Sequence, residues 1–96
     1  MRKLSEIKGE EAIDVLAEII VPITAIANDD EVQAGFNENV AKCVSIALKK
    51  HKSEVIEIFA SINGKSVEET LEEIDIVSLP SYIIDTLNEP AIQSLF

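Results

Sequence analysis

Apolar residues recur at helical spacing along most of this chain. The first such run begins near Gly9 or Glu10 and predicts a helix. Four apolar side chains at positions i, i+3, i+4 and i+7 form the face that we expect to point into the core: Ile13, Leu16, Ala17 and Ile20. Acidic residues recur every four positions on another side, as a solvated face or as a stripe for a basic partner: Glu10, Asp14 and Glu18.

Pro22 interrupts this run, because proline has no amide hydrogen and its ring clashes with the carbonyl of Glu18. The apolar period nevertheless continues from Ile19 to Ile26. One kinked helix and two short helices therefore both fit the pattern. The Asn-Asp-Asp sequence of residues 28–30 then predicts a turn.

Two helices are predicted between residues 37 and 63. The first runs from about Asn37, a candidate N-cap, to Lys50. The second begins at the candidate N-cap Ser53 and ends at Gly64, which can adopt the left-handed conformation that closes a helix. We expect the apolar side chains of both helices to lie in the core: Val40, Cys43, Val44, Ala47, Leu48, Val55, Ile58, Phe59 and Ile62.

The last third of the chain predicts two more helices and an apolar tail. Ser66 and Glu69 have the spacing of a capping box, and Ser78 opens a further helix that is broken at Glu89 and the following proline. The first of these helices presents Val67, Leu71 and Ile74, and the second is expected to place Ile83, Ile84 and Leu87 in the core. The tail, residues 91–96, either folds back onto the core or stays exposed as a hook for a partner.

The composition is that of a small folded domain. The 96 residues are 47% hydrophobic and 27% charged, which is typical of a globular chain rather than a disordered one. No alternation of period two persists long enough to predict a strand, with residues 74–79 as the only ambiguous stretch, and no linker or repeat divides the sequence. We therefore predict an all-α fold: a single compact domain over residues 1–96 with five or six short helices.

Charge is distributed unevenly along the sequence. The net charge is −10, and residues 9–41 and 66–96 contain acids but no lysine or arginine. Such a chain repels phosphate backbones, so we expect no nucleic-acid partner. Residues 42–52 contain four lysines and no acid. This segment either complements the dipole at the end of its own helix or docks an acidic surface, including that of another copy.

The sequence also limits the compartment. Cys43 is the only cysteine, so it forms no internal disulfide, fits a reducing compartment and is expected to be buried. The N-terminus has no apolar run of the kind found in signal peptides. The longest apolar stretch, residues 19–23, is far too short to span a bilayer. We expect a soluble, cytoplasmic protein without a membrane partner.

No combination of residues predicts catalysis or metal binding. The only histidine, His51, follows two lysines at a helix end, where we expect a solvated imidazole. A calcium loop starting at Asp30 fails, because Val32 and Ala34 occupy positions that require oxygen ligands, and a capped turn explains these acids better. Ser78 lacks the preceding aspartate of an acyl carrier motif, which favours an N-cap role. We expect no enzyme, no catalytic residue, no cofactor and no metal.

The N-terminal sequence carries a resemblance to a known family. Residues 3–17 read Lys-Leu-Ser-Glu-Ile-Lys-Gly-Glu-Glu-Ala-Ile-Asp-Val-Leu-Ala, and residues 18–23 continue Glu-Ile-Ile-Val-Pro-Ile. This segment resembles the N-terminus of the small tail assembly chaperones of long-tailed, siphovirus-type bacteriophages of Gram-positive bacteria. The remainder is similar in general character: an acidic helical chain of about this size, with a lysine-rich middle and proline-bounded helices downstream.

The resemblance implies a non-enzymatic role in viral tail assembly. Such proteins are thought to coat the tape-measure protein in the host cytoplasm until tail-tube subunits polymerise around it, and they are absent from the mature virion. A ribosomal frameshift often adds a C-terminal extension to a second product. We also expect self-association. The alternatives are a phage structural or head–tail connector protein, an acidic inhibitor or decoy of a basic protein, and a carrier-type accessory protein modified on Ser78.

Overall fold

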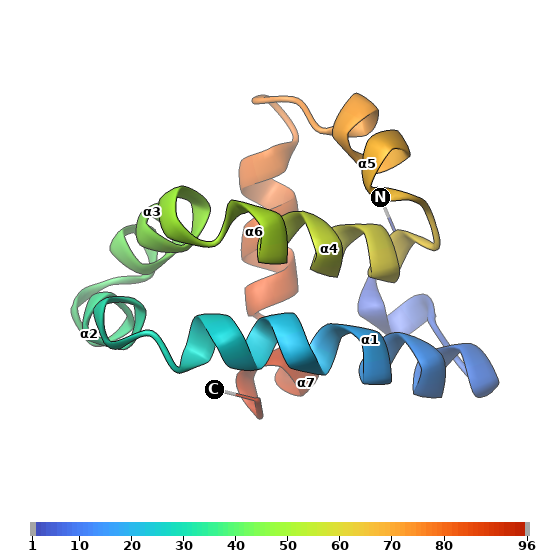
Figure 1. The fold of residues 1–96 in the computed structure, drawn as a ribbon, viewed down its shortest axis with the longest axis horizontal. Helices are drawn as coiled ribbons and strands as arrows, with labels where there is room; N and C mark the ends of the chain where they lie inside the picture. Colours follow the sequence, from blue (N-terminus) through green and yellow to red (C-terminus); the bar gives the residue numbers. More distant parts are fainter. Residues whose placement is uncertain (1, 96) are drawn as a thin grey trace.

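Helices form all of the regular structure in the computed structural model, which describes residues 2–95 (Figure 1). They comprise the 3-10 helix η1 (Leu4–Glu6) and seven α-helices, with no strand in the described part of the chain. The α-helices are α1 (Glu10–Ala27), α2 (Asp30–Glu38), α3 (Val40–Lys50), α4 (Lys52–Asn63), α5 (Val67–Glu73), α6 (Leu79–Leu87) and α7 (Pro90–Gln93). The predicted all-α class is confirmed, with seven helices where five or six were expected.

The additional helices are short and have weak apolar patterns. α2 was not expected beyond the predicted turn, and it is nucleated by Asp29, whose carboxylate accepts hydrogen bonds from the amides of Glu31 and Val32. α7 is a single turn within the expected apolar tail. α2 is defined by its cap and by the burial of Val32, and α7 by the proline at its start and the burial of Ile92. A search for apolar periodicity does not detect these features.

Two predicted helix starts were misplaced. α3 begins at Val40 rather than near Asn37, and its N-cap is Asn39, whose side chain accepts a hydrogen bond from the amide of Lys42 at 2.7 Å. α4 begins at Lys52 rather than after Ser53, and its N-cap residue makes no side-chain capping bond. The capping box of Ser66 and the left-handed Gly64 were predicted correctly, because both depend on a few neighbouring residues.

α1 is one continuous helix through Pro22, but the predicted inward face is wrong. Its buried residues are Val15, Ile19, Pro22, Ile23 and Ile26. The four residues expected in the core are all exposed to solvent: Ile13, Leu16, Ala17 and Ile20. The buried stripe continues past Pro22 and therefore runs along more of the helix than the stripe that was predicted, so it removes more apolar area from water.

The core lies between α1 and α4, which run side by side, and α6 crosses behind both (Figure 1). Tyr82 of α6 packs edge-on against Phe59 of α4 with ring centroids 4.9 Å apart, and its hydroxyl donates a hydrogen bond to the carbonyl of Arg2. Ile92 is only 3% exposed, so the apolar tail is docked on the core as far as residue 95. Phe96 lies outside the described residues.

Gly64 has φ +65° at the C-terminal end of α4, in the region where a Cβ atom clashes with the backbone. We expect Gly64→Ala to lower the free energy of unfolding by about 1 kcal/mol. Urea denaturation followed by circular dichroism measures this. The matched control is Gly64→Asn. Asparagine adopts the left-handed conformation more readily than alanine, so this variant should lose less free energy of unfolding. Equal stability of the alanine variant and the wild-type chain would contradict the expectation.

Candidate functional site

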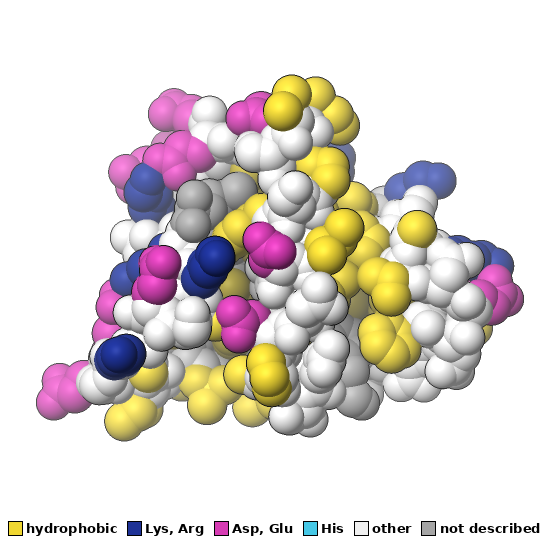
Figure 2. Space-filling model, turned by 180° about the vertical axis from the view of Figure 1, so that it is seen from behind, with side chains coloured by type: hydrophobic (Ala, Val, Ile, Leu, Met, Phe, Trp, Pro, Cys, Tyr) yellow, Lys and Arg dark blue, Asp and Glu magenta, His cyan; other side chains and the backbone are white. Residues whose placement is uncertain are grey.

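An apolar groove lies between α3 and α6 on the face opposite to that of Figure 1. Figure 2 shows this face, where hydrophobic side chains gather between the two helices. The volume of the groove is about 560 Å³. Its apolar walls consist of Val40, Ala41, Val44 and Leu48 from α3, and of Ile76, Leu79, Pro80, Ile83 and Ile84 from α6 and the residues before it.

Several lining side chains are unusually exposed for aliphatic residues. Val40 is 48% exposed and Ile84 is 52% exposed, although the sequence placed both in the core. That part of the prediction is wrong. Val40 belongs to the α3 wall of the groove and Ile84 to the α6 wall, and nothing in the described structure covers either side chain. Ile76, in the turn before α6, is 85% exposed. A contiguous exposed patch of this kind is typical of a surface that binds another apolar surface.

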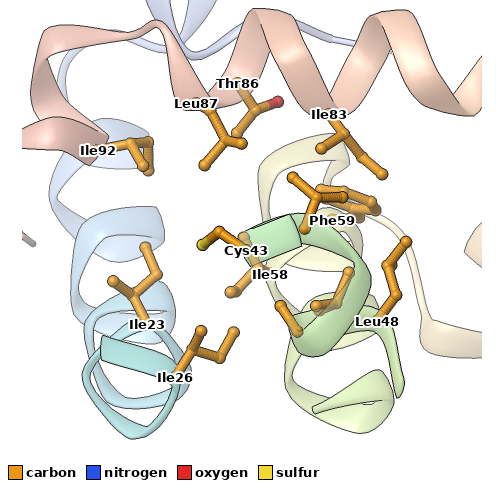
Figure 3. Close-up of a pocket in the computed structure, with 13 residues that line it drawn as sticks. Ile23, Ile26, Cys43, Leu48, Ile58, Phe59, Ile83, Thr86, Leu87 and Ile92 are labelled. Atoms are coloured by element: carbon orange, nitrogen blue, oxygen red, sulfur yellow. The ribbon is translucent and has the colours of Figure 1, made fainter. Parts of the chain in front are cut away.

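The groove continues into a small cavity beneath α6. The cavity measures about 90 Å³, has a wholly apolar lining, and shares Val44, Leu48 and Ile83 with the groove. Figure 3 shows Ile83 and Leu87 of α6 pointing down into it, towards Cys43 and Phe59. Cys43 is buried as expected, and burial raises the pKa of its thiol, so the thiol stays protonated at neutral pH. Thr86 also lines the cavity, but its hydroxyl donates to the carbonyl of Tyr82, so the surface that faces the cavity is apolar.

Close packing of α2 on α3 supports one wall of the groove. Gly35 of α2 faces α3 so closely that a Cβ atom at this position would lie 3.2 Å from the amide nitrogen of Cys43. The absence of a side chain therefore allows the two helices to approach each other. Cys43 is buried on the inner side of α3 by this contact, which leaves Val40 and Val44 facing the groove.

A polar contact fixes the two ends of this helical hairpin. The carboxylate of Asp29, before α2, lies 2.8 Å from Nζ of Lys50 and 2.8 Å from Nε2 of His51, at the end of α3. Two hydrogen bonds hold the pKa of Asp29 well below its usual range. The bond from Lys50 has the larger effect and the bond with His51 the smaller one. Lys50 also pairs with Glu31. The contact therefore joins the α1–α2 turn to the α3–α4 turn.

The residues considered for catalysis have structural roles. His51 is not a solvated imidazole, and that prediction is wrong: its side chain is only 15% exposed and contacts Asp29. Asp30 and Glu31 form the first turn of α2, which Asp29 caps; the cap fits the expected capped turn, but the helix that follows was not expected. Ser78 occupies the N-cap position of α6, but its hydroxyl donates to the carboxylate of Asp75 instead of capping the helix.

Within residues 2–95, no group of three or more His, Cys, Asp or Glu side chains is arranged to hold a metal ion. None of the described helices has the length and hydropathy needed to cross a bilayer.

The lysine segment, residues 42–52, is partly neutralised by nearby acids. Lys42 pairs with Glu38, and Lys50 pairs with Asp29 and Glu31. Lys49 lies in the last turn of α3 at the edge of the groove, and it makes no ion pair within the described residues. It is also the one charged side chain in the groove lining. The groove therefore has a basic edge on the α3 side.

Comparison with known proteins gives no further guidance, because the chain matches no protein-family model, no curated protein and no solved structure.

The pKa shift of Asp29 predicts a loss of stability in acid. A carboxyl whose pKa is lowered by folding stabilises the protein fully above its unfolded pKa of about 3.9, and this stabilisation disappears as the pH falls below that value. We expect Asp29→Asn to be less stable than the wild-type chain at pH 7. We also expect its stability to decline less between about pH 5 and pH 2.

Thermal unfolding across this pH range tests the expectation. Asp30→Asn is the matched control, because its carboxyl is adjacent in sequence but accepts no side-chain hydrogen bond within the described residues. If both variants showed the pH dependence of the wild-type chain, the contact of Asp29 with Lys50 and His51 would not stabilise the fold.

Proposed function

We propose that this chain is a non-enzymatic tail assembly chaperone of a long-tailed bacteriophage, which binds the tape-measure protein during tail assembly. The observation that carries the proposal is the apolar groove between α3 and α6. Its lining is aliphatic and substantially exposed, and it has only one charged side chain. The tape-measure protein is proposed as the partner because of the N-terminal resemblance, and the groove is a surface to which such a protein can bind.

The groove has the chemistry needed to receive a helix. Amphipathic helices bind in apolar grooves through side chains at positions i, i+3, i+4 and i+7. The two walls are themselves helices, and the wholly apolar cavity below Ile83 extends the apolar surface towards the core. A tape-measure protein is long and helical, so it offers many segments of this type. Binding would cover apolar faces that otherwise aggregate.

The charge of the chain supports the same role. A net charge of −10 opposes non-specific association between chaperone copies, while the groove itself lacks acidic residues. We further propose that the protein acts in the cytoplasm of the bacterial host, is absent from the mature virion, and associates with other copies of itself.

Disruption of the groove tests this proposal. We expect the double variant Val40→Gln/Ile84→Gln to recover at least about tenfold less tape-measure protein than the wild-type chain, when tagged protein is purified from phage-producing cells. Mass spectrometry identifies and quantifies the recovered chains. Both substituted residues are about half exposed, so the variant should keep its helical circular dichroism spectrum.

The matched control is Val67→Gln/Leu71→Gln on α5, which removes two aliphatic residues that are 40% and 49% exposed and lie outside the groove. It should recover as much tape-measure protein as the wild-type chain. Recovery of connector proteins, or of a basic host enzyme, in place of a tape-measure protein would refute the proposal. Detection of the chain in purified virions would do the same.

A further inference from the structure

A second exposed apolar surface runs along the outside of α1. The outer α1 stripe consists of Ile13, Leu16, Ala17, Ile20 and Val21. Ile13 is 69% exposed and Val21 is 71% exposed, on a helix whose opposite side is packed against α4. The spacing i, i+3, i+4, i+7 is that of an amphipathic helix prepared to enter a groove. Among the described residues, Leu16 borders a pocket with Ala91 and Leu95, and the other large side chains of the stripe remain exposed.

One edge of the outer α1 stripe is acidic. Asp14 lies seven positions before Val21 and therefore within about 20° of it around the helix. Glu18 lies further round, where its carboxylate accepts a hydrogen bond from the hydroxyl of Ser61 on α4. Glu10 lies one turn before Asp14 on the same edge. Glu10 and Asp14 make no ion pair within the described residues. A partner for this stripe therefore needs an aliphatic surface with positive charge along one side.

The groove between α3 and α6 has these properties. It is aliphatic, its one charged lining residue is Lys49, and this lysine is unpaired within the described residues. Lys42 lies two turns earlier on the same side of α3. The outer α1 stripe belongs to a different helix and contributes no residue to the groove. Contact between them in one copy is prevented, because the other side of α1 is fixed against α4.

We infer that the groove of one copy binds the outer α1 stripe of a second copy, with Asp14 of the second copy near Lys49 of the first. The two surfaces differ, so the contact is heterologous: each copy can bind one neighbour through its stripe and another through its groove. Pairing of two α1 stripes is disfavoured, because residues 9–41 carry eight acids and no lysine or arginine.

This self-association uses the groove that the proposed function assigns to the tape-measure protein, and to that extent it rests on the proposed function. The two occupants exclude each other. Free chaperone would therefore keep its apolar surfaces covered by other copies, and an apolar helix of the tape-measure protein would displace the neighbouring α1. The fraction of self-associated chaperone therefore decreases as the tape-measure protein binds.

Complementation between two variants tests the inference. The stripe variant is Ile13→Gln/Val21→Gln, and the groove variant is Val40→Gln/Ile84→Gln. Sedimentation equilibrium of the purified full chain at about 0.15 M salt, which screens charge beyond about 8 Å, measures the association constants. We expect the mass of the wild-type chain to rise with concentration, and each variant alone to associate at least about tenfold more weakly.

The equimolar mixture of the two variants is decisive. Each mixed pair retains one intact stripe and one intact groove, so a one-to-one complex should form and should not grow further. Circular dichroism verifies that both variants are folded, and Val67→Gln/Leu71→Gln serves as the control that should associate like the wild-type chain. A monomeric wild-type chain, wild-type association of either variant, or no complex in the mixture would overturn the inference.

The outcome is separable from that of the proposed function. If the stripe variant captures tape-measure protein while the wild-type chain is monomeric, the inference fails and the proposed function stands. If the variants behave as expected but no tape-measure protein is captured by any form, the proposed function fails and the self-association stands.

Discussion

The packing of α1 against α4 is the contact on which the rest of the structure depends. α1 contributes Val15, Ile19, Ile23 and Ile26, and α4 contributes Ile58, Phe59 and Ile62, all of them buried. Arg2 fixes one end of this pair: its guanidinium donates to the Ile62 carbonyl at 2.7 Å and to the carboxylate of Glu11 at 3.0 Å. Glu11 is thereby held beside α4, and the buried side chains of α1 orient the helix with its other apolar stripe outward.

This orientation of α1 has consequences at both ends of the molecule. The α1–α2 turn is brought to the α3–α4 turn, where Asp29 contacts Lys50 and His51. α3 is then held with its inner side on the core and its other apolar side free. α6 crosses behind and supplies the second wall (Figure 1). The groove is therefore a product of how the helices are arranged, and no single helix contains it.

The features predicted correctly from the sequence are those determined by neighbouring residues. The capping box at Ser66 and the left-handed Gly64 each depend on hydrogen bonds within one helical turn. The contact between Asp29 and His51 was missed because the two residues are 22 positions apart and nothing local links them. The choice between the two stripes of α1 was also beyond a periodicity argument, since both have helical spacing and only tertiary packing distinguishes them.

The groove was missed for a related reason. Val40 lies at helical spacing from the buried Cys43, and Ile84 lies beside the partly buried Ile83 and Leu87, so apolar pattern alone assigns all of them to one core. A domain of 96 residues buries a smaller fraction of its surface than a larger one does. With 47% hydrophobic residues, this chain has more aliphatic side chains than such a core can cover. Ile76 and Val77, which the structure places in the turn between α5 and α6, belong to this surplus, because each is 85% exposed.

Most of the large exposed aliphatic residues lie on α1 or line the groove, and the others are Val67, Leu71 and Val77. Exposed aliphatic residues scattered singly are normal, whereas those of α1 form one stripe and those of α3 and α6 form one groove. The charges next to them have opposite sign: acidic residues border the stripe and lysine borders the groove. If these aliphatic residues only stabilised the fold, the stripe and the groove would not need charges of opposite sign beside them. An apolar surface with like charge along its edge resists pairing with itself, so the acidic edge of α1 directs the stripe towards a basic groove and away from another stripe.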